Sequence, residues 1–227
     1  MFLTETHMHT SETSACASAT GAYQACQYKE LGYDTIIITD HFLNGNTTVD
    51  RSLPWEKQVE LFCRGYENAK KQGDEIGITV LFGIEYAWSG CDLLIYGIDK
   101  QWLLDNPDCA EIDVHEFCDR VHKAGGIVVH AHPFREANYI RDMKFLPLYT
   151  DGVEVYNAGN RDPIWNERAE WYADQFGFVK TAGSDCHHAV PDAPGRFAGV
   201  YTATKIETIQ DYVKAVKYGE IESLKTR

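Results

Sequence analysis

Short runs of β-branched and apolar residues alternate along this chain with longer stretches of helical periodicity, and this alternation limits the folds that the chain can adopt. Strands are predicted at about 2–6, 35–39, 126–129, 152–156 and 178–182, and two more end at Glu85 and near Gly97. Helices are predicted near 18–31, 54–72, 113–124, 163–176 and 206–218. Because strands that alternate with helices usually pair in parallel, the pattern predicts an α/β fold with a barrel-like parallel sheet.

The length and composition of the chain suit one domain of barrel size. The sequence has 227 residues, of which 44% are hydrophobic, and this is enough to bury one sizeable core. No internal repeat or low-complexity tract divides the sequence. We therefore expect a single domain over residues 1–227.

The charge balance disfavours two classes of partner. The chain carries 21 basic and 34 acidic residues, and a net charge of -13 repels both duplex nucleic acid and anionic lipid. The first residues lack the basic and apolar regions of a secretory signal, and no apolar stretch is long enough to span a bilayer. We expect a cytoplasmic protein that binds neither duplex nucleic acid nor a membrane.

The number and spacing of the cysteines do not indicate a disulfide framework or a zinc site. There are seven of them, an odd number, and none forms a C-x-x-C pair. They are interpreted as buried or bystander thiols of a reducing compartment rather than as disulfides or a zinc ribbon.

Histidines and carboxylates follow the predicted strands, at the point where each strand ends. These residues are His7, His9, Asp40, His41, Glu85, His130, His132, Glu154, Asp185 and His187. In parallel barrels the C-terminal strand ends form one face, so these side chains are expected to converge there. Residues two apart on a strand point to the same side, so each histidine pair and the Asp185 to His187 pair offers two ligands in one direction. The sequence therefore predicts a metal site.

Some of these residues have other predicted roles. Asp40 points away from its neighbour His41 on a strand, which favours a supporting role over ligation. His130 lies one pleat deeper than His132 and is expected to be a hydrogen-bonded core histidine. Glu154 and Asn157 are expected to orient ligands or substrate, because ligating imidazoles need hydrogen-bond acceptors behind them.

Five short segments, taken in order, resemble the PHP (polymerase and histidinol phosphatase) family. They are Thr6-His7-Met8-His9-Thr10, Thr39-Asp40-His41, Gly83-Ile84-Glu85, Ala131-His132-Pro133 and Gly183-Ser184-Asp185-Cys186-His187. Each segment alone is weak, but the ordered set is specific and covers almost the whole chain. The resemblance implies a distorted (β/α)7 TIM-like barrel that holds two to three divalent metal ions, commonly Zn, Mn or Fe, and hydrolyses phosphate esters.

The resemblance also implies how the ligands are shared. One metal would take His7, His9, Glu85 and Asp185. Glu85 would bridge to a second metal that also takes His132, because a carboxylate has two oxygens to share. A third metal would take His41 and His187.

The sequence departs from the usual family pattern at two positions. Where some relatives have a histidine or aspartate shortly after the first pair, Glu12 is the best substitute, and an exposed loop residue is the alternative. Where many relatives have a histidine before the strand at 93–97, this chain has Asp92, and Asp99 at the far end is the rival. Ligation by Glu12 and Asp92 would make the site harder and would favour Mn or Fe over Zn.

Two residues are candidates for contact with the substrate. Arg135 follows the His132-Pro133 segment and could hold a phosphate with its planar fork, as could Arg161 or Arg196. His188 follows the last ligand segment and is a candidate substrate contact or general acid.

These features favour an enzyme, a metal-dependent phosphoesterase that hydrolyses a small phosphorylated metabolite or nucleotide by metal-activated water. Histidinol phosphate, nucleotides, short oligonucleotides and phosphotyrosine all remain open as substrates, and the oligomeric state is open too. Two alternatives come from other classes. One is a catalytically degenerate module that binds metal or nucleotide for regulation, and the other is a metal-dependent amidohydrolase, since those barrels also begin with a His-x-His pair.

Overall fold

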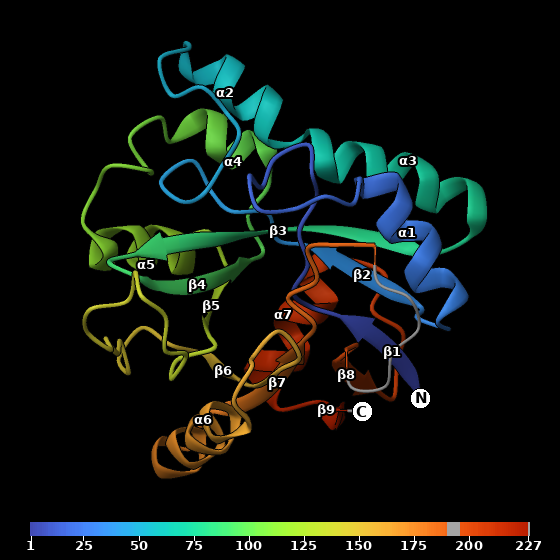
Figure 1. Cartoon of the computed structure of the whole chain (residues 1–227), viewed down its shortest axis with the longest axis vertical. Helices are drawn as coiled ribbons and strands as arrows, with labels where there is room; N and C mark the ends of the chain where they lie inside the picture. The colour runs from blue at the N-terminus through green and yellow to red at the C-terminus, as the bar shows by residue number, and fades with distance from the viewer. Residues whose placement is uncertain (190–195, 227) are drawn as a thin grey trace.

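In a computed structural model of the chain, which describes residues 1–189 and 196–226, one continuous sheet forms the centre of the molecule (Figure 1). The sheet order is β7-β6-β5-β4-β3-β2-β1-β8-β9. The strands are β1 (Phe2–Glu5), β2 (Thr35–Ile38), β3 (Thr79–Trp88), β4 (Cys91–Tyr96), β5 (Ile127–Ala131), β6 (Gly152–Asn157), β7 (Val179–Gly183), β8 (Gly199–Thr202) and β9 (Ile221–Lys225).

Helices connect most of these strands. They are α1 (Gly21–Glu30), α2 (Trp55–Phe62), α3 (Arg64–Ile76), α4 (Lys100–Asp105), α5 (Val114–Lys123), α6 (Pro163–Phe176) and α7 (Ile209–Tyr218). The predicted helix near 54–72 is in fact two helices that meet at Cys63, and the short α4 was not predicted. Local signals set the ends, since Asp162 caps α6 at its start and Gly177 ends it with a φ of 70°.

The sheet curls until its first and seventh strands meet. Met8 and Cys186 form a parallel bridge just beyond β1 and β7, and the Thr6 hydroxyl donates to the Ala182 carbonyl at 2.9 Å. The strands β1 to β3 pair in parallel, as do β5 to β7. The predicted distorted TIM-like barrel is therefore confirmed.

The distortion lies in β4, which runs antiparallel to both β3 and β5. The prediction that all the barrel strands run parallel is therefore wrong for β4. The reversal brings the start of β4 to the rim where its neighbours end, because Asp92 pairs with Ala87 and with Ala131. Asp99 follows the other end of the strand and caps α4 by accepting from the backbone of Trp102 at 2.8 Å. The rival candidate Asp99 is thereby placed away from the predicted ligands.

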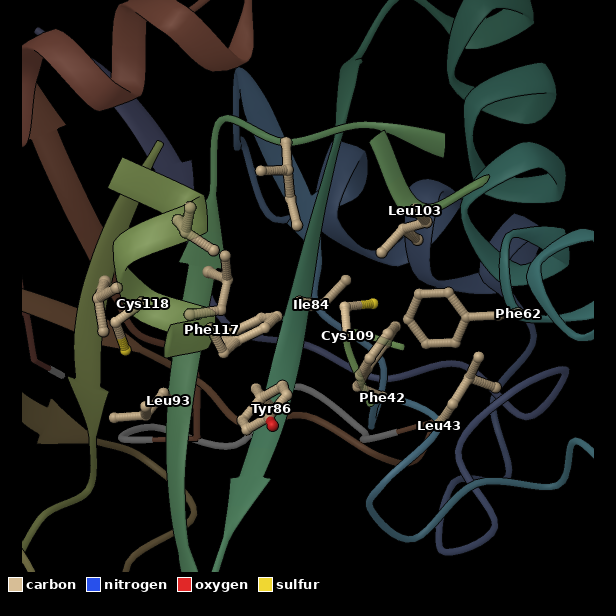
Figure 2. Packing of buried hydrophobic residues seen from close by; sticks show 14 of the residues in the cluster. Phe42, Leu43, Phe62, Ile84, Tyr86, Leu93, Leu103, Cys109, Phe117 and Cys118 are labelled. Atoms are coloured by element: carbon tan, nitrogen blue, oxygen red, sulfur yellow. The ribbon is translucent and has the colours of Figure 1, made fainter. Parts of the chain in front are cut away.

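Two apolar layers hold this part of the barrel, and β4 contributes to both. Leu93 and Ile95 pack with α5 on one side, whereas the alternate residue Leu94 packs with α7 on the other. Burial on both faces explains why β4 is a continuous apolar run. In the first layer the rings of Tyr86 and Phe117 stack with centroids 3.9 Å apart (Figure 2), which fixes β3 against α5.

In residues 1–189 and 196–226, the helices are all too short or too polar to cross a bilayer.

Candidate metal centre

The candidate ligands sit on short segments just beyond the strand ends. His7 and His9 follow β1, His132 follows β5, and Asp185 and His187 follow β7. Backbone hydrogen bonds lock the first and last of these segments together, because His9 N donates to the Cys186 carbonyl at 2.9 Å and Asp185 N donates to the His7 carbonyl at 2.8 Å. Closure of the barrel therefore brings residues about 180 positions apart into one site.

Glu85 lies at the centre of the site, on β3. Its Oε1 is 3.2 Å from Nε2 of both His7 and His132, and its Oε2 is 3.4 Å from Nε2 of His9 and 2.7 Å from Nδ1 of His41. The side chain is almost wholly buried. One carboxylate therefore faces two pairs of imidazoles, each with a different oxygen, and this is the geometry that a bridging ligand needs.

Three groups of side chains are close enough to hold a metal ion, with ligand atoms that lie within 4.8 Å of one another. They are His7, Glu85 and His132; His7, His9 and Asp185; and His9, His41 and His187. The structure thus brings together seven of the predicted ligands. The groups differ from the implied division, because His7 also joins Glu85 and His132, and His9 also joins His41 and His187.

The hydrogen bonds behind His7 and His9 turn the lone pairs of both rings toward the site. The carboxylate of Glu154 lies 2.9 Å from His7 Nδ1, so this nitrogen carries the proton. Ser14 already donates to Asp40 at 2.7 Å, so its hydroxyl accepts from His9 Nδ1 at 3.0 Å. Each ring therefore keeps the lone pair on Nε2.

These lone pairs face one another and the central carboxylate. His7 Nε2 and His9 Nε2 are 3.2 Å apart, and both rings are fully buried. Oε2 of Glu85 makes no well-directed hydrogen bond among the described residues, although His41 Nδ1 lies 2.7 Å from it. Buried acceptors without a donor between them are costly, and a divalent cation satisfies all of them at once. The side chains present therefore fit a metal ion.

The electrostatics of the cluster fit this donor set at Glu85 and His9. At His7 and His41 burial lowers the pKa, but the carboxylates beside the two rings raise it above its usual value, so a metal ion would have to displace a proton there. Burial alone raises the pKa of Glu85, but His41 and His7 beside it hold the pKa of that carboxyl well below its usual range. Burial lowers the pKa of His9 well below its usual value, and His187 and His41 lower it further. The site thus keeps its carboxylate charged and this imidazole neutral, the forms in which they bind metal.

A second layer of side chains supports the ligands. Glu154 holds His7 and also accepts from the backbone N–H of His132 at 3.1 Å, and Asn157 donates to it at 2.8 Å. Asp40 accepts from the backbone and hydroxyl of Thr10 and from Ser14. The predicted supporting roles of Glu154, Asn157 and Asp40 agree with these contacts.

The backbone at two ligands departs from strand geometry. His132 has a φ of 29° and Asp185 a φ of 52°, values that a residue with a side chain seldom adopts. Asp185 and His187 therefore reach the site from an irregular segment beyond β7, and the predicted strand alternation does not explain their common direction.

His130 does not share the direction of His132. Its ring packs against Phe145 and Tyr172, with centroids 5.8 Å and 6.3 Å away, and neither ring nitrogen has a hydrogen-bond partner within the described residues. It is a core histidine as predicted, but the predicted hydrogen bond is wrong. Burial lowers its pKa to about 3, so it stays neutral.

Glu12 and Asp92, the two predicted oxygen substitutes, differ in position. The carboxylate of Glu12 accepts from the backbone of Gly21 at the start of α1 and from Asn68 at 3.0 Å, and Glu12 belongs to none of the three groups. Asp92 Oδ2 lies 3.9 Å from His132 Nε2, and burial beside Glu85 raises the pKa of Asp92 to about 6. Asp92 is likewise in none of the three groups but lies at the edge of the site, whereas Glu12 is turned toward α1.

Arg135 is tied to a ligand. Its Nη2 donates to Asp185 at 2.7 Å and to Asn157 at 2.9 Å, and its Nε donates to Asn160 at 2.9 Å. The guanidinium also lines a cavity of about 690 Å³ beside the metal groups. Arg135 can thus both orient Asp185 and face a substrate.

The other candidate substrate contacts line the same cavity. Arg161, Arg196 and His188 all contribute to its wall. The ring of His188 is exposed and its Nδ1 lies 2.8 Å from the Ser18 hydroxyl. In a chain of net charge -13, three arginines around one cavity mark it as a place for an anion.

Sequence reasoning missed Cys16, which lines this cavity and a second one of about 460 Å³ on the other side of the site. Burial raises its pKa, but hydrogen bonds with His187 and His41 lower the pKa of this thiol to about 6. The cysteine number and spacing predicted only buried or bystander thiols. The signal in the sequence that could have indicated a cysteine near the site is that Cys16 lies seven residues after His9.

Comparison with known sequences gives two kinds of match. A family model described as PHP-associated matches residues 163–221. Two proteins of Methanocaldococcus jannaschii, both named as uncharacterized, are similar to parts of this chain. One is 33% identical over 86 residues, which are 34% of this chain and 36% of that protein. The other is 27% identical over 142 residues, which are 62% of this chain and 68% of that protein.

Three solved structures share the fold at low sequence identity. A two-domain protein of Bacteroides vulgatus, which contains a predicted PHP-like metal-dependent phosphoesterase, has a TM-score of 0.69 at 15% identity; the match covers 96% of this chain and 63% of that one. A proposed metal-dependent phosphoesterase of Bifidobacterium adolescentis has a TM-score of 0.56 at 18% identity, with 86% and 91% covered. An amidohydrolase of Chromobacterium violaceum with bound sulfate has a TM-score of 0.53 at 16% identity, with 94% and 96% covered.

This chain spans about a third of the first curated relative and less than two thirds of the Bacteroides chain. The structural neighbours nevertheless share the barrel fold with this chain. The PHP-associated family model matches the C-terminal part of the sequence, residues 163–221. The resemblance of this chain to the PHP family is thereby confirmed.

Proposed function

We propose that this protein is a metal-dependent phosphoesterase that hydrolyses a phosphate ester of a small metabolite or nucleotide. The observation that carries the proposal is the position of Glu85, whose two oxygens face different pairs of histidines at the rim of the barrel. A bridging carboxylate of this kind suits a cluster of two or three divalent ions. The arginine-lined cavity beside it supports an anionic substrate.

Bound divalent ions would supply an activated water and would offset the negative charge that protects a phosphate ester from attack. The residues of the chain have three tasks around that chemistry. Glu154 and Ser14 keep the lone pairs of His7 and His9 directed inward. Arg135 keeps Asp185 ionised and in place, and a face of its guanidinium is open to a phosphate oxygen.

The leaving oxygen of a phosphate ester needs a proton, and His188 is our candidate donor. Its ring lies on the wall of the arginine-lined cavity, outside the three metal groups, and Ser18 fixes one of its nitrogens. The other nitrogen is therefore available to a leaving group in the cavity.

The structural neighbours support this proposal in different degrees. The Bacteroides protein is described as containing a predicted PHP-like metal-dependent phosphoesterase, and the Bifidobacterium protein as a proposed metal-dependent phosphoesterase. The Chromobacterium protein is named as an amidohydrolase, and this keeps hydrolysis of an amide as a second candidate function.

The test is a panel of phosphomonoesters, phosphodiesters and N-acyl amino acids, each assayed with Mn²⁺, Zn²⁺ and Fe²⁺. We expect phosphate release with at least one metal and none after chelation. Turnover of the amides alone would replace the proposal with the amidohydrolase. A protein that binds metal and turns over neither class would support a regulatory module.

A further inference from the structure

We propose that Cys16 is a sulfur ligand of the metal ion held by His41 and His187, and that this position therefore takes a thiophilic ion such as Zn²⁺ or Fe²⁺. This inference rests on the metal centre of the proposed function but not on which ester is hydrolysed. It concerns a thiol that the sequence motifs do not mark.

The first observation is the place of Cys16 between two histidines from distant parts of the chain. Cys16, His41 and His187 line one cavity of about 460 Å³, so the thiol and both imidazoles face the same space. Independently of Cys16, these two rings and His9 form a group whose ligand nitrogens lie within 4.8 Å of one another. The thiol therefore stands beside a ready-made set of nitrogen donors.

The second observation is that the segment carrying Cys16 is anchored to both partners. Ser14 accepts from the backbone N–H of His41 at 3.0 Å, and Ser18 N donates to the carbonyl of His187 at 2.8 Å. Between them, Ala15 N donates to the Asn46 carbonyl at 2.9 Å. The turn is thus tied down on each side of the cysteine, and pre-organisation of this kind is what a metal ligand requires.

The third observation is the tautomer of His187. Its Nδ1 donates to the carbonyl of Asp185 at 2.9 Å, so Nε2 keeps the lone pair. Cys16 and His187 line both cavities that flank the site, so they stand together where solvent reaches the metal groups. Glu12, the predicted ligand of this region, is occupied at the start of α1.

The chemistry of sulfur changes the expected metal. Thiolate ligands select Zn²⁺ and iron over Mn²⁺ and Mg²⁺, which prefer oxygen. At this position the sulfur ligand of Cys16 would replace the oxygen ligand predicted from Glu12, so the site would prefer softer metal ions than the sequence predicted.

The test is a spectroscopic titration of the metal-free protein with Co²⁺, recorded without substrate. We expect the wild-type protein to show the near-ultraviolet charge-transfer band of a cobalt–thiolate bond. Cys16→Ser should lose this band and bind at least about tenfold more weakly at one position. Cys26→Ser, which changes a cysteine of α1 outside the three groups, should keep both.

A second measurement uses the unmodified protein and so does not depend on the folding of a variant. Alkylation with iodoacetamide, followed by peptide mass analysis, should modify Cys16 in the metal-free protein and at least tenfold more slowly after Zn²⁺ is added, with no such change at Cys26. Co²⁺ bound without the band, or a band that survives in Cys16→Ser, would overturn the assignment of Cys16 alone. A protein that binds no Co²⁺ would overturn the metal centre as well.

Discussion

Among single residues, Glu85 has a direct consequence for activity, because its side chain faces His7, His9, His41 and His132 together. Glu85→Gln keeps the shape but removes the negative charge between the ions, so their mutual repulsion is no longer offset. We expect phosphate release to fall at least ~100-fold with the fold retained. Metal content by mass spectrometry and the rate of phosphate release check this.

Glu75→Gln is the matched control for that change, because it makes the same substitution at an exposed glutamate of α3. Its activity and metal content should equal those of the wild type. Full metal content together with near-normal turnover in Glu85→Gln would contradict the bridging role.

Arg135 offers a different test, since its fork holds Asp185 and faces the cavity. Arg135→Lys keeps the charge but loses the planar geometry, so kcat/KM for a monoester should fall by about 1.5–3 kcal/mol, with a smaller loss for a diester. If the role is only to position Asp185, both esters should lose equally and metal content should fall. Unchanged rates in both Arg135→Lys and Arg135→Ala would contradict this role, and Arg161 or Arg196 would then be the candidate that binds the phosphate.

His130 predicts a pH dependence of stability. Its pKa in the folded protein is about 3, against 6.5 for an unperturbed histidine, so below pH 6.5 the unfolded chain binds a proton that the folded chain does not. The folded state should therefore lose about 1.4 kcal/mol for each pH unit between 6.5 and 3 from this residue alone.

His130→Leu should flatten the fall of unfolding free energy between pH 6.5 and 5, as measured by urea denaturation. His115→Gln is the control, because His115 is exposed, and it should keep the wild-type slope. An unchanged slope in His130→Leu would show that the acid sensitivity comes from other groups.

The site residues that the sequence could identify are those that lie next to an apolar run typical of a strand. His7, His9, Glu85 and His132 each follow or end an apolar run, and one-dimensional spacing is enough to select them. The partners of Arg135 could not be predicted, because its bond to Asp185 joins positions 50 residues apart and depends on how the barrel closes. Cys16 was missed for the same reason.

At the scale of elements, the reversal of β4 shows what an apolar pattern leaves open. A strand buried on both faces has the same hydrophobic run in either direction, so periodicity could not orient it. The link between β3 and β4 did contain a signal, since only Ser89 and Gly90 separate them, both with positive φ. A two-residue link permits a hairpin and excludes a parallel crossover.

The close contact between the end of β7 and the segment after β1 predicts that a single added methyl group at Gly183 will disturb the site. A Cβ on Gly183 would collide with the His7 side chain and would lie 2.6 Å from Oε1 of Glu154. Gly183→Ala should therefore cost on the order of 1–3 kcal/mol of stability and should also lower metal affinity, because both neighbours belong to the site. Thermal unfolding and metal titration check the two effects.

Gly125→Ala is a useful comparison for that variant, because a Cβ there meets nothing within 4 Å and only its positive φ is strained. We expect it to lose some stability but no metal affinity. Loss of stability without loss of metal affinity in Gly183→Ala would mean that the β7 and β1 contact does not position the ligands.

At the scale of the whole molecule, the metal centre lies where the barrel closes. His7 follows β1, Asp185 follows β7 and Glu154 lies within β6, and His7 contacts both carboxylates, with 2.9 Å to Glu154 and 3.6 Å to Asp185. A cation that binds there would therefore connect the segments that follow β1 and β7, where the barrel closes. It should stabilise the folded chain as a whole, since the unfolded chain cannot assemble these ligands.

Removal of metal should consequently lower the melting temperature. With free metal at 100 times its Kd, one site contributes about 2.7 kcal/mol, which corresponds to about 5–10 °C for a chain of this size. The experiment is calorimetry of protein dialysed free of metal, then with Zn²⁺ or Mn²⁺ added back. Glu85→Gln should regain much less on addition, which separates binding in the site from surface binding. An equal rise in both proteins, or no change after removal has been verified by elemental analysis, would place the bound metal outside the region where the barrel closes.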